Sequence, residues 1–319
     1  MKILFAPLEG ITYPEYRFVH SSVFGGADEY YCPFVTPSGS GDYKIEFLKK
    51  RLGKISGEAK VIPQILANSP EAFSATARLF SELGCDEVNL NAGCPSGTVV
   101  SKHKGAGMLS DLDSLRRFLE KIYENADVRI SIKTRMGVDS TDEFDDILEV
   151  YNDFPVSKLI VHARDRKGLY KSKVDIEGFG KAAGRSQNPV YYNGDIFSVS
   201  DADALTERYP EIAGIMVGRG AVADPALLRE ISGGPGAGRD EMKKMHDMLL
   251  DEFVSSGLTL NYIVERMKNL WKYMYVLYPG HEKEFKAINK CKRFEDYRSI
   301  SESLLKCEID PNGKFSDGQ

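Results

Sequence analysis

Several short apolar runs in this sequence are each followed directly by polar residues or glycines that could bind a ligand or carry out chemistry. A polar residue at one such place says little, but its recurrence predicts a ligand site if the runs are neighbouring strands of one sheet. The segments are Pro7-Leu8-Glu9-Gly10, Gln64, Asn89-Leu90-Asn91-Ala92-Gly93-Cys94-Pro95, Lys133-Thr134-Arg135, His162-Ala163-Arg164, Asn193-Gly194-Asp195 and Gly218-Arg219-Gly220.

Two of these segments have the composition of a phosphate site. Backbone N–H groups around Gly194 and from Gly218 to Gly220 could bind a phosphate, and Arg219 could add a charge-assisted contact. The alternative interpretation is that these glycines only turn the chain.

Cys94 is the candidate for reactive chemistry. Gly93 and Pro95 place it in an irregular loop, where a thiol is more accessible than in a packed strand. The alternative is a small buried side chain with a packing role, which is the interpretation we give to Cys85.

Eight strands that alternate with helices would bring these residues together. This rhythm predicts a parallel sheet with crossover helices, and eight strands favour a closed (β/α)₈ TIM barrel over an open sheet. Ser69, Ser110 and Ser198 are predicted helix N-caps. The predicted strands are Ile3 to Ala6, Asp28 to Tyr31, Val61 to Ile65, Glu87 to Asn91, Ile130 to Thr134, Leu159 to His162, Val190 to Asn193 and Gly214 to Val217.

The glycine-rich run from 233 to 238 predicts a linker, because glycine at this density holds neither a helix nor a strand. We therefore expect a barrel domain over 1–232, a small helical bundle over 239–308 and a disordered tail over 309–319. The bundle's predicted core positions are Leu249, Phe253, Leu260, Ile263, Met267, Leu270 and Met274.

Composition limits the class of protein. The chain has 319 residues, 42% of them hydrophobic, and a net charge of −5, which argues against indiscriminate coating of nucleic acid. Local basic clusters remain, at 102–104, 164–173 and 290–293. No signal peptide or membrane span is indicated, so we expect a protein that does not enter membranes. The five cysteines lack C-x-x-C spacing, which predicts neither disulfides nor a bound metal and indicates a reducing cytoplasm.

The order of the motifs resembles that of the tRNA-dihydrouridine synthase family. The resemblance covers the whole predicted barrel, and a helical C-terminal domain is also what that family has. The most specific motif of the resemblance is the N-L-N-x-G-C-P block. Each of the other motifs, taken alone, is weak evidence for the family. The matching segments are Ala6 to Gly10, Asn89 to Pro95, Lys133 to Gly137, His162 to Arg164, Asn193 to Ile196 and Gly218 to Gly220.

The resemblance implies an FMN enzyme that uses NADPH or NADH to reduce uridines in tRNA, and we expect a monomer. Cys94 would be the catalytic acid, and Asn91, Arg135 and Arg164 would face the tRNA. The residues implied to bind the flavin are Pro7, Leu8, Glu9, Gln64, Lys133 and His162 at its ring, and Asn193, Gly194, Asp195, Gly218 and Arg219 at its phosphate.

A thiol and a lysine suit the reduction of uracil by a flavin. Reduction of the uracil C5–C6 bond requires a hydride and a proton. The hydride passes from N5 of the reduced flavin to C6 of uracil, and the proton is added at C5. Cysteine thiols ordinarily titrate near pH ~8.5, so they stay mostly protonated at neutral pH and remain acidic enough to donate. A nearby lysine such as Lys133 would stabilise the anionic reduced flavin. The target base must leave its stack, and Tyr30, Tyr31, Phe34 and Tyr170 are possible stacking surfaces.

Two alternatives remain open from the sequence. A dihydroorotate or dihydropyrimidine dehydrogenase shares the barrel and FMN, but a free pyrimidine would not require a helical C-terminal domain. A non-catalytic RNA-binding barrel would have no reason to retain a yellow flavin.

Overall fold

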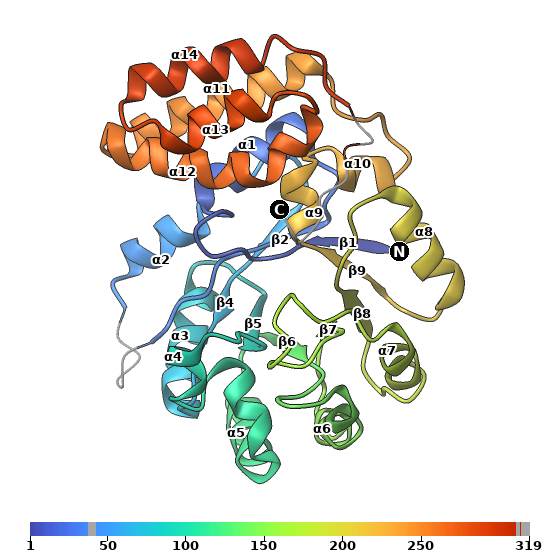
Figure 1. The fold of residues 1–319 in the computed structure, drawn as a ribbon. Helices are drawn as coiled ribbons and strands as arrows, with labels where there is room; N and C mark the ends of the chain where they lie inside the picture. The colour runs from blue at the N-terminus through green and yellow to red at the C-terminus, as the bar shows by residue number, and fades with distance from the viewer. Residues whose placement is uncertain (38–42, 311–312, 314–319) are drawn as a thin grey trace.

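The computed structural model describes residues 1–37, 43–310 and 313. Its first part is a ring of parallel strands surrounded by helices (Figure 1). The strands are β1 (Lys2–Phe5), β2 (Glu29–Tyr31), β3 (Lys60–Ile62), β4 (Gln64–Ile65), β5 (Glu87–Ala92), β6 (Arg129–Arg135), β7 (Leu159–His162), β8 (Val190–Asn193) and β9 (Gly214–Val217). The predicted (β/α)₈ TIM barrel is confirmed.

The structure divides the predicted third strand in two at Pro63. β3 pairs with β2 and β4 pairs with β5, so the sheet order runs β3-β2-β1-β9-β8-β7-β6-β5-β4 among the described residues. Proline has no N–H to give to the ladder, although the Pro63 carbonyl still accepts the N–H of Asn89 at 2.9 Å. Because β3 and β4 are joined through this single residue, the chain itself closes the ring.

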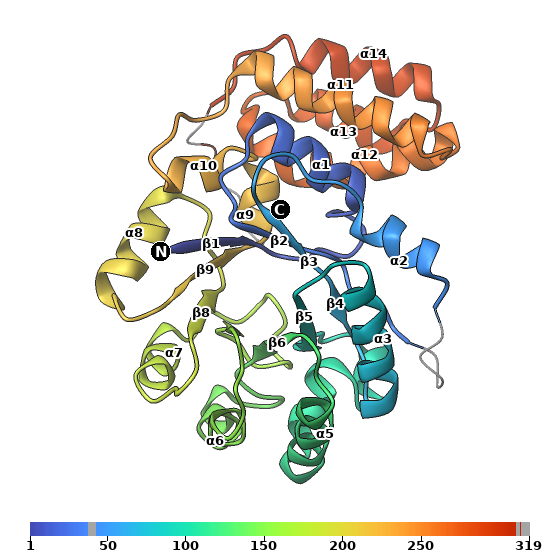
Figure 2. The ribbon, with the colours of Figure 1, turned by 180° about the vertical axis from the view of Figure 1, so that it is seen from behind.

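Helices cover the outside of the barrel (Figures 1 and 2). They are α1 (Pro14–Val23), α2 (Ile45–Leu52), α3 (Pro70–Glu82), α5 (Leu112–Glu124), α6 (Phe144–Asn152), α7 (Ile176–Ala183) and α8 (Val199–Arg208), with the shorter α4 (Gly97–Val100), α9 (Arg219–Ala223) and α10 (Leu227–Ile231).

Two of the three predicted N-caps are confirmed. Ser69 accepts the N–H of Ala72, and Ser198 accepts the N–H of Asp201, each at 3.2 Å. The third prediction is wrong by one residue: α5 is capped by Asp111, because Ser110 ends a 3₁₀ helix over Gly105–Ser110.

The bottom of the barrel is closed by a buried ion cluster. The Lys158 ammonium lies 2.6 and 2.7 Å from the two Glu87 oxygens and 3.0 Å from Glu29 Oε1. Glu29 and Glu87 begin β2 and β5, so the cluster lies at the N-terminal strand ends, away from any site at the opposite ends. Because each buried charge is paired, removal of one partner would leave an uncompensated charge in the barrel.

The chain after the glycine run is helical, as predicted. It forms α11 (Arg239–Ser255), α12 (Leu260–Met274), α13 (Glu282–Lys290) and α14 (Phe294–Leu304). Six of the seven predicted core residues are buried, whereas Leu260 is 47% exposed. Leu260 is the first residue of α12, and periodicity identifies a helix face without showing where along the helix packing begins.

The helical region is docked onto the barrel. α11 packs against α1 and α12 against α9 (Figure 1), and Ser256 Oγ donates to Glu15 Oε1 at 2.8 Å. Asp310, in the predicted disordered tail, donates its N–H to Leu277 O at 2.8 Å. Residues 311–312 and 314–319 of that tail lie outside the described residues. No helix in the described part of the chain is both long and apolar enough to span a bilayer.

Candidate active site

The strand ends surround two adjoining cavities. The Arg219 cavity, of about 60 Å³, lies at the ends of β8 and β9 and is lined by Asn193, Gly194, Asp195, Gly218 and Arg219 among others. The Cys94 cavity, of about 280 Å³, lies at the ends of β4, β5 and β6. Residues that line both cavities are Pro7, Leu8, Lys133, His162 and Tyr170.

Almost all of the predicted site residues line one cavity or the other. Glu9, Gln64, Asn91, Cys94 and Arg135 line the Cys94 cavity, together with the residues that the two cavities share. Of the predicted site residues, Arg164 alone lines neither of these two cavities. Residues from strand ends far apart in the sequence are therefore brought to one end of the barrel.

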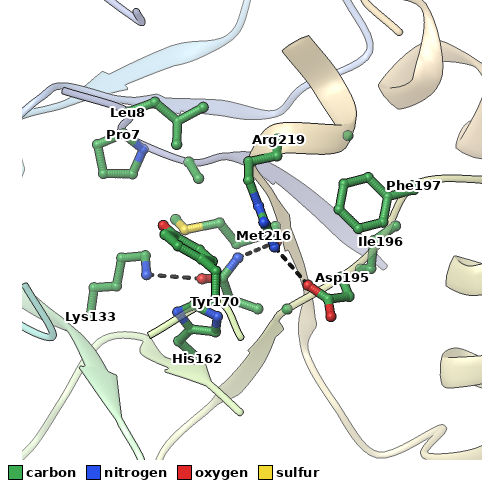
Figure 3. A pocket seen from close by; sticks show the side chains of 15 residues that line it. Pro7, Leu8, Lys133, His162, Tyr170, Asp195, Ile196, Phe197, Met216 and Arg219 are labelled. Atoms are coloured by element: carbon green, nitrogen blue, oxygen red, sulfur yellow. Dashed lines mark hydrogen bonds and ion pairs between the residues drawn. The ribbon is translucent and has the colours of Figure 1, made fainter. Parts of the chain in front are cut away.

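The Asp195 carboxylate in the Arg219 cavity is held between two guanidinium groups, and Figure 3 shows its contact with that of Arg219. Asp195 Oδ1 lies 2.9 Å from Arg164 Nη1 and 2.8 Å from Arg219 Nη2, and Asp195 Oδ2 accepts from Arg164 Nη2. The Arg219 guanidinium stacks 4.1 Å from the centre of the Tyr170 ring. Arg164, predicted to face tRNA, is 2% exposed and stands behind Asp195.

Lys133 and His162 lie where the two cavities meet. Lys133 Nζ donates to Asn193 Oδ1 at 2.9 Å, and Asn193 Nδ2 donates to Met216 O at 2.8 Å (Figure 3). Burial, and then repulsion from Arg135, lower the pKa of Lys133 to about 7. Burial and the surrounding cations hold the pKa of His162 well below its ordinary value, so His162 is neutral at neutral pH.

A chain of amides supports the loop that carries Cys94. Gln64 Nε2 donates to Asn89 Oδ1 at 2.7 Å, and Asn91 Nδ2 donates to Gln64 Oε1 at 2.8 Å. Asn91 Oδ1 then accepts the N–H groups of Gly93 at 3.1 Å and Cys94 at 2.9 Å. Asn91 therefore fixes the start of the Cys94 loop, in addition to lining the Cys94 cavity.

A second segment holds Cys94 from the other side. The Cys94 carbonyl accepts the N–H of Ala106 at 3.1 Å. Gly105 has a φ of +56°, and a Cβ there would lie 2.8 Å from the Cys94 carbonyl oxygen. Gly105 was not among the predicted site residues, although glycine is the usual residue where two backbone segments approach closely.

Arg135 ties two loops together. It is 1% exposed, and its guanidinium donates to the carbonyls of Gly93 at 3.1 Å, Asp165 at 2.6 Å and Leu169 at 3.2 Å. Gly93 precedes Cys94, and Leu169 precedes Tyr170. Arg135 thus links the Cys94 loop to the loop that carries Tyr170. The alternation of side chains along the strand did not predict these contacts with backbone carbonyls.

The predicted stacking aromatics divide into two groups. Tyr30 and Tyr31 are fully buried, with hydroxyls bonded to His20 at 2.8 Å and Glu29 at 3.1 Å, so the prediction that they form a stacking surface is wrong. Phe34 and Tyr170 do line the Cys94 cavity. The helical region adds one residue that the sequence analysis missed: Tyr273 of α12 also lines this cavity, and no local pattern distinguished it.

The fold and site together define a class: a barrel enzyme with a cation-rich ligand cavity beside a loop cysteine. No group of three or more His, Cys, Asp or Glu side chains arranged to hold a metal occurs among the described residues.

Comparison with known proteins defines the family. The model of the family described as dihydrouridine synthase (Dus) matches residues 4–303. The tRNA-dihydrouridine(16) synthase of Pseudomonas putida is 30% identical, over 95% of this chain and 96% of that protein. That of Ralstonia nicotianae is 31% identical, over 73% of each chain. The chain therefore belongs to the dihydrouridine synthase family, and it is an oxidoreductase.

Solved structures share the fold. The structure of a morphinone reductase mutant in complex with tetrahydroNAD aligns with a TM-score of 0.53 at 11% identity, covering 74% of this chain and 87% of that chain. At this identity the likeness shows the barrel fold alone.

Proposed function

We propose that this protein is an FMN-dependent tRNA-dihydrouridine synthase that uses NADPH or NADH to reduce uridine 16 of tRNA. The observation that carries the proposal is the junction of the two cavities. The cation-rich Arg219 cavity suits an anionic cofactor, and it shares Lys133 and His162 with the cavity of Cys94.

The residues of the Arg219 cavity fit FMN. A Cβ at Gly218 would lie 3.4 Å from Ala6 Cβ and 3.9 Å from Leu8 Cδ2, so the missing side chain leaves room at the cavity wall. Gly194, Gly218 and Arg219 would bind the phosphate, and Arg219 would supply positive charge. Pro7, Leu8 and the neutral His162 would contact the ring.

Bound FMN would supply a hydride at uracil C6. Cys94 would then donate a proton at C5, from a loop that Asn91, Arg135 and Gly105 hold in place. Lys133 would place positive charge beside the ring, where negative charge develops on reduction.

The substrate assignment is supported by the relatives and by the helical region. The relative from Pseudomonas putida, which aligns over almost the full length of both chains, is named for position 16. Tyr273 brings α12 into the Cys94 cavity, and a free pyrimidine would not require this region. We also infer a monomer in a reducing cytoplasm, which light scattering and cell fractionation would test.

The experiment that tests the function is a map of dihydrouridine in tRNA from a strain that lacks this gene. We expect dihydrouridine to be absent at position 16 and to return when the wild-type gene is restored. Unchanged dihydrouridine throughout tRNA would refute the function, and loss at another position would refute only the assignment to position 16.

FMN binding should take up a proton through Lys133. In the free protein the pKa of Lys133 is lowered to about 7, so the side chain is mostly neutral at pH 8. An anionic ligand favours the charged form and raises that pKa. FMN affinity should therefore fall by up to ~10-fold for each pH unit above about 7, and calorimetry at pH 8 in buffers of different ionisation heat should detect the proton.

Lys133→Met should remove this proton uptake. Lys104→Met is the matched control, because burial also lowers the pKa of Lys104 but Lys104 lines neither cavity. If proton uptake on FMN binding persists in Lys133→Met, a group other than Lys133 takes up the proton.

A further inference from the structure

Asp195 has a charge that does not suit a phosphate-binding residue. Its carboxylate lies in the Arg219 cavity and accepts hydrogen bonds from both Arg164 and Arg219. A carboxylate beside a phosphate would repel it. We therefore expect Asp195 to have a role other than direct contact with the phosphate.

The two guanidinium groups hold Asp195 differently. Arg164 donates through both Nη atoms to the two carboxylate oxygens, and its Nε donates to Ser172 O at 2.7 Å. The Arg164 side chain is 2% exposed, whereas that of Arg219 is 10% exposed and meets the Asp195 carboxylate through Nη2 and Oδ1. Arg164 is thus the more buried partner, and Arg219 is the partner that lines the cavity.

We propose that Asp195 is an internal counter-anion that competes with the phosphate group of the cofactor for Arg219 while it stays bound to Arg164. This inference rests on the proposed function, because it takes FMN to be the ligand of the Arg219 cavity. The ligand class it concerns is the phosphate monoester dianion.

The arrangement disfavours the binding of small anions that have no contact other than the phosphate. With Asp195 in place, its carboxylate offsets part of the positive charge of Arg164 and Arg219, and an incoming phosphate must displace the Arg219–Asp195 ion pair. FMN gains additional contacts from its ring, whereas inorganic phosphate has none. Asp195 therefore lowers the affinity of the empty site for inorganic phosphate.

The test compares FMN with riboflavin, which lacks the phosphate. Asp195→Asn removes the charge and keeps the size, and asparagine tolerates the φ of +25° at this position. We expect Asp195→Asn to tighten FMN binding by about tenfold or more, with riboflavin affinity changed less than about twofold. Flavin fluorescence titration of flavin-free protein measures both. Asp203→Asn, on α8, changes the net charge equally and lines neither cavity, so it should leave both affinities unchanged.

A second measurement uses inorganic phosphate as the probe. Millimolar phosphate should raise the melting temperature of flavin-free Asp195→Asn more than that of the wild type, and adding Arg219→Ala should abolish the difference. Weaker FMN binding in Asp195→Asn, alone or together with weaker riboflavin binding, would overturn the inference and make Asp195 a support for the site. A wild-type protein that binds neither flavin would instead refute the proposed cofactor, and the inference with it.

Discussion

Cys94→Ala should slow the oxidation of the reduced enzyme by tRNA by ~10²- to 10⁴-fold, the usual contribution of a positioned general acid. Flavin content and flavin reduction by NADPH should stay nearly unchanged, because Cys94 lines the Cys94 cavity and not the Arg219 cavity. Stopped-flow absorbance of the two half-reactions separates these effects.

The control for this variant is Cys85→Ala. Cys85 is half-buried and free, and it lines neither cavity, so both half-reactions should keep their wild-type rates. If Cys94→Ala were reoxidised by tRNA as fast as the wild type, Cys94 would not be the acid.

Gly105→Ala should lower tRNA reduction by about 10²-fold while FMN remains bound, because a displacement of about 1 Å at a reacting group can cost this much in rate. The added Cβ would lie 2.8 Å from the Cys94 carbonyl oxygen and 2.9 Å from Cys94 Cβ, so the Cys94 loop must shift. The left-handed φ of +56° adds strain, which should lower the free energy of unfolding by about 1–3 kcal/mol. Steady-state turnover of tRNA and thermal unfolding measure the two effects.

Gly97→Ala is the matched control in the same segment. A Cβ at Gly97 meets no atom within 4 Å, and alanine suits its place at the start of α4. Turnover and stability should therefore stay at wild-type values. Wild-type turnover in Gly105→Ala, measured with the protein shown to be folded, would mean that packing against Gly105 does not position Cys94.

Much of the fold could be predicted from local sequence. Apolar runs identified the strands, helix-start residues identified the N-caps of α3 and α8, and the glycine run marked the change from barrel to helical region. The strand-end motifs also identified residues that line the two cavities. Each of these features depends on residues close together in the chain, where periodicity and turn chemistry operate.

The direction of side chains within the strands could not be predicted. Tyr30 and Tyr31 are both buried, one bonded to His20 and the other to Glu29. In a barrel both faces of a strand are covered, by helices outside and by side chains inside, so alternation of apolar and polar residues disappears. An aromatic residue in such a strand therefore gives no sign of whether it packs or lines a site.

The sequence by itself determined the barrel, the helical region and the residue types at the strand ends, because these follow from short-range patterns. Only the tertiary structure decided what those residues contact. Asp195 meets Arg164 and Arg219, which lie 31 and 24 residues away, and Arg135 bonds backbone carbonyls of two separate loops. Closure of the barrel brings these groups together, and the separation along the chain between partners leaves no local pattern from which their pairing could be predicted.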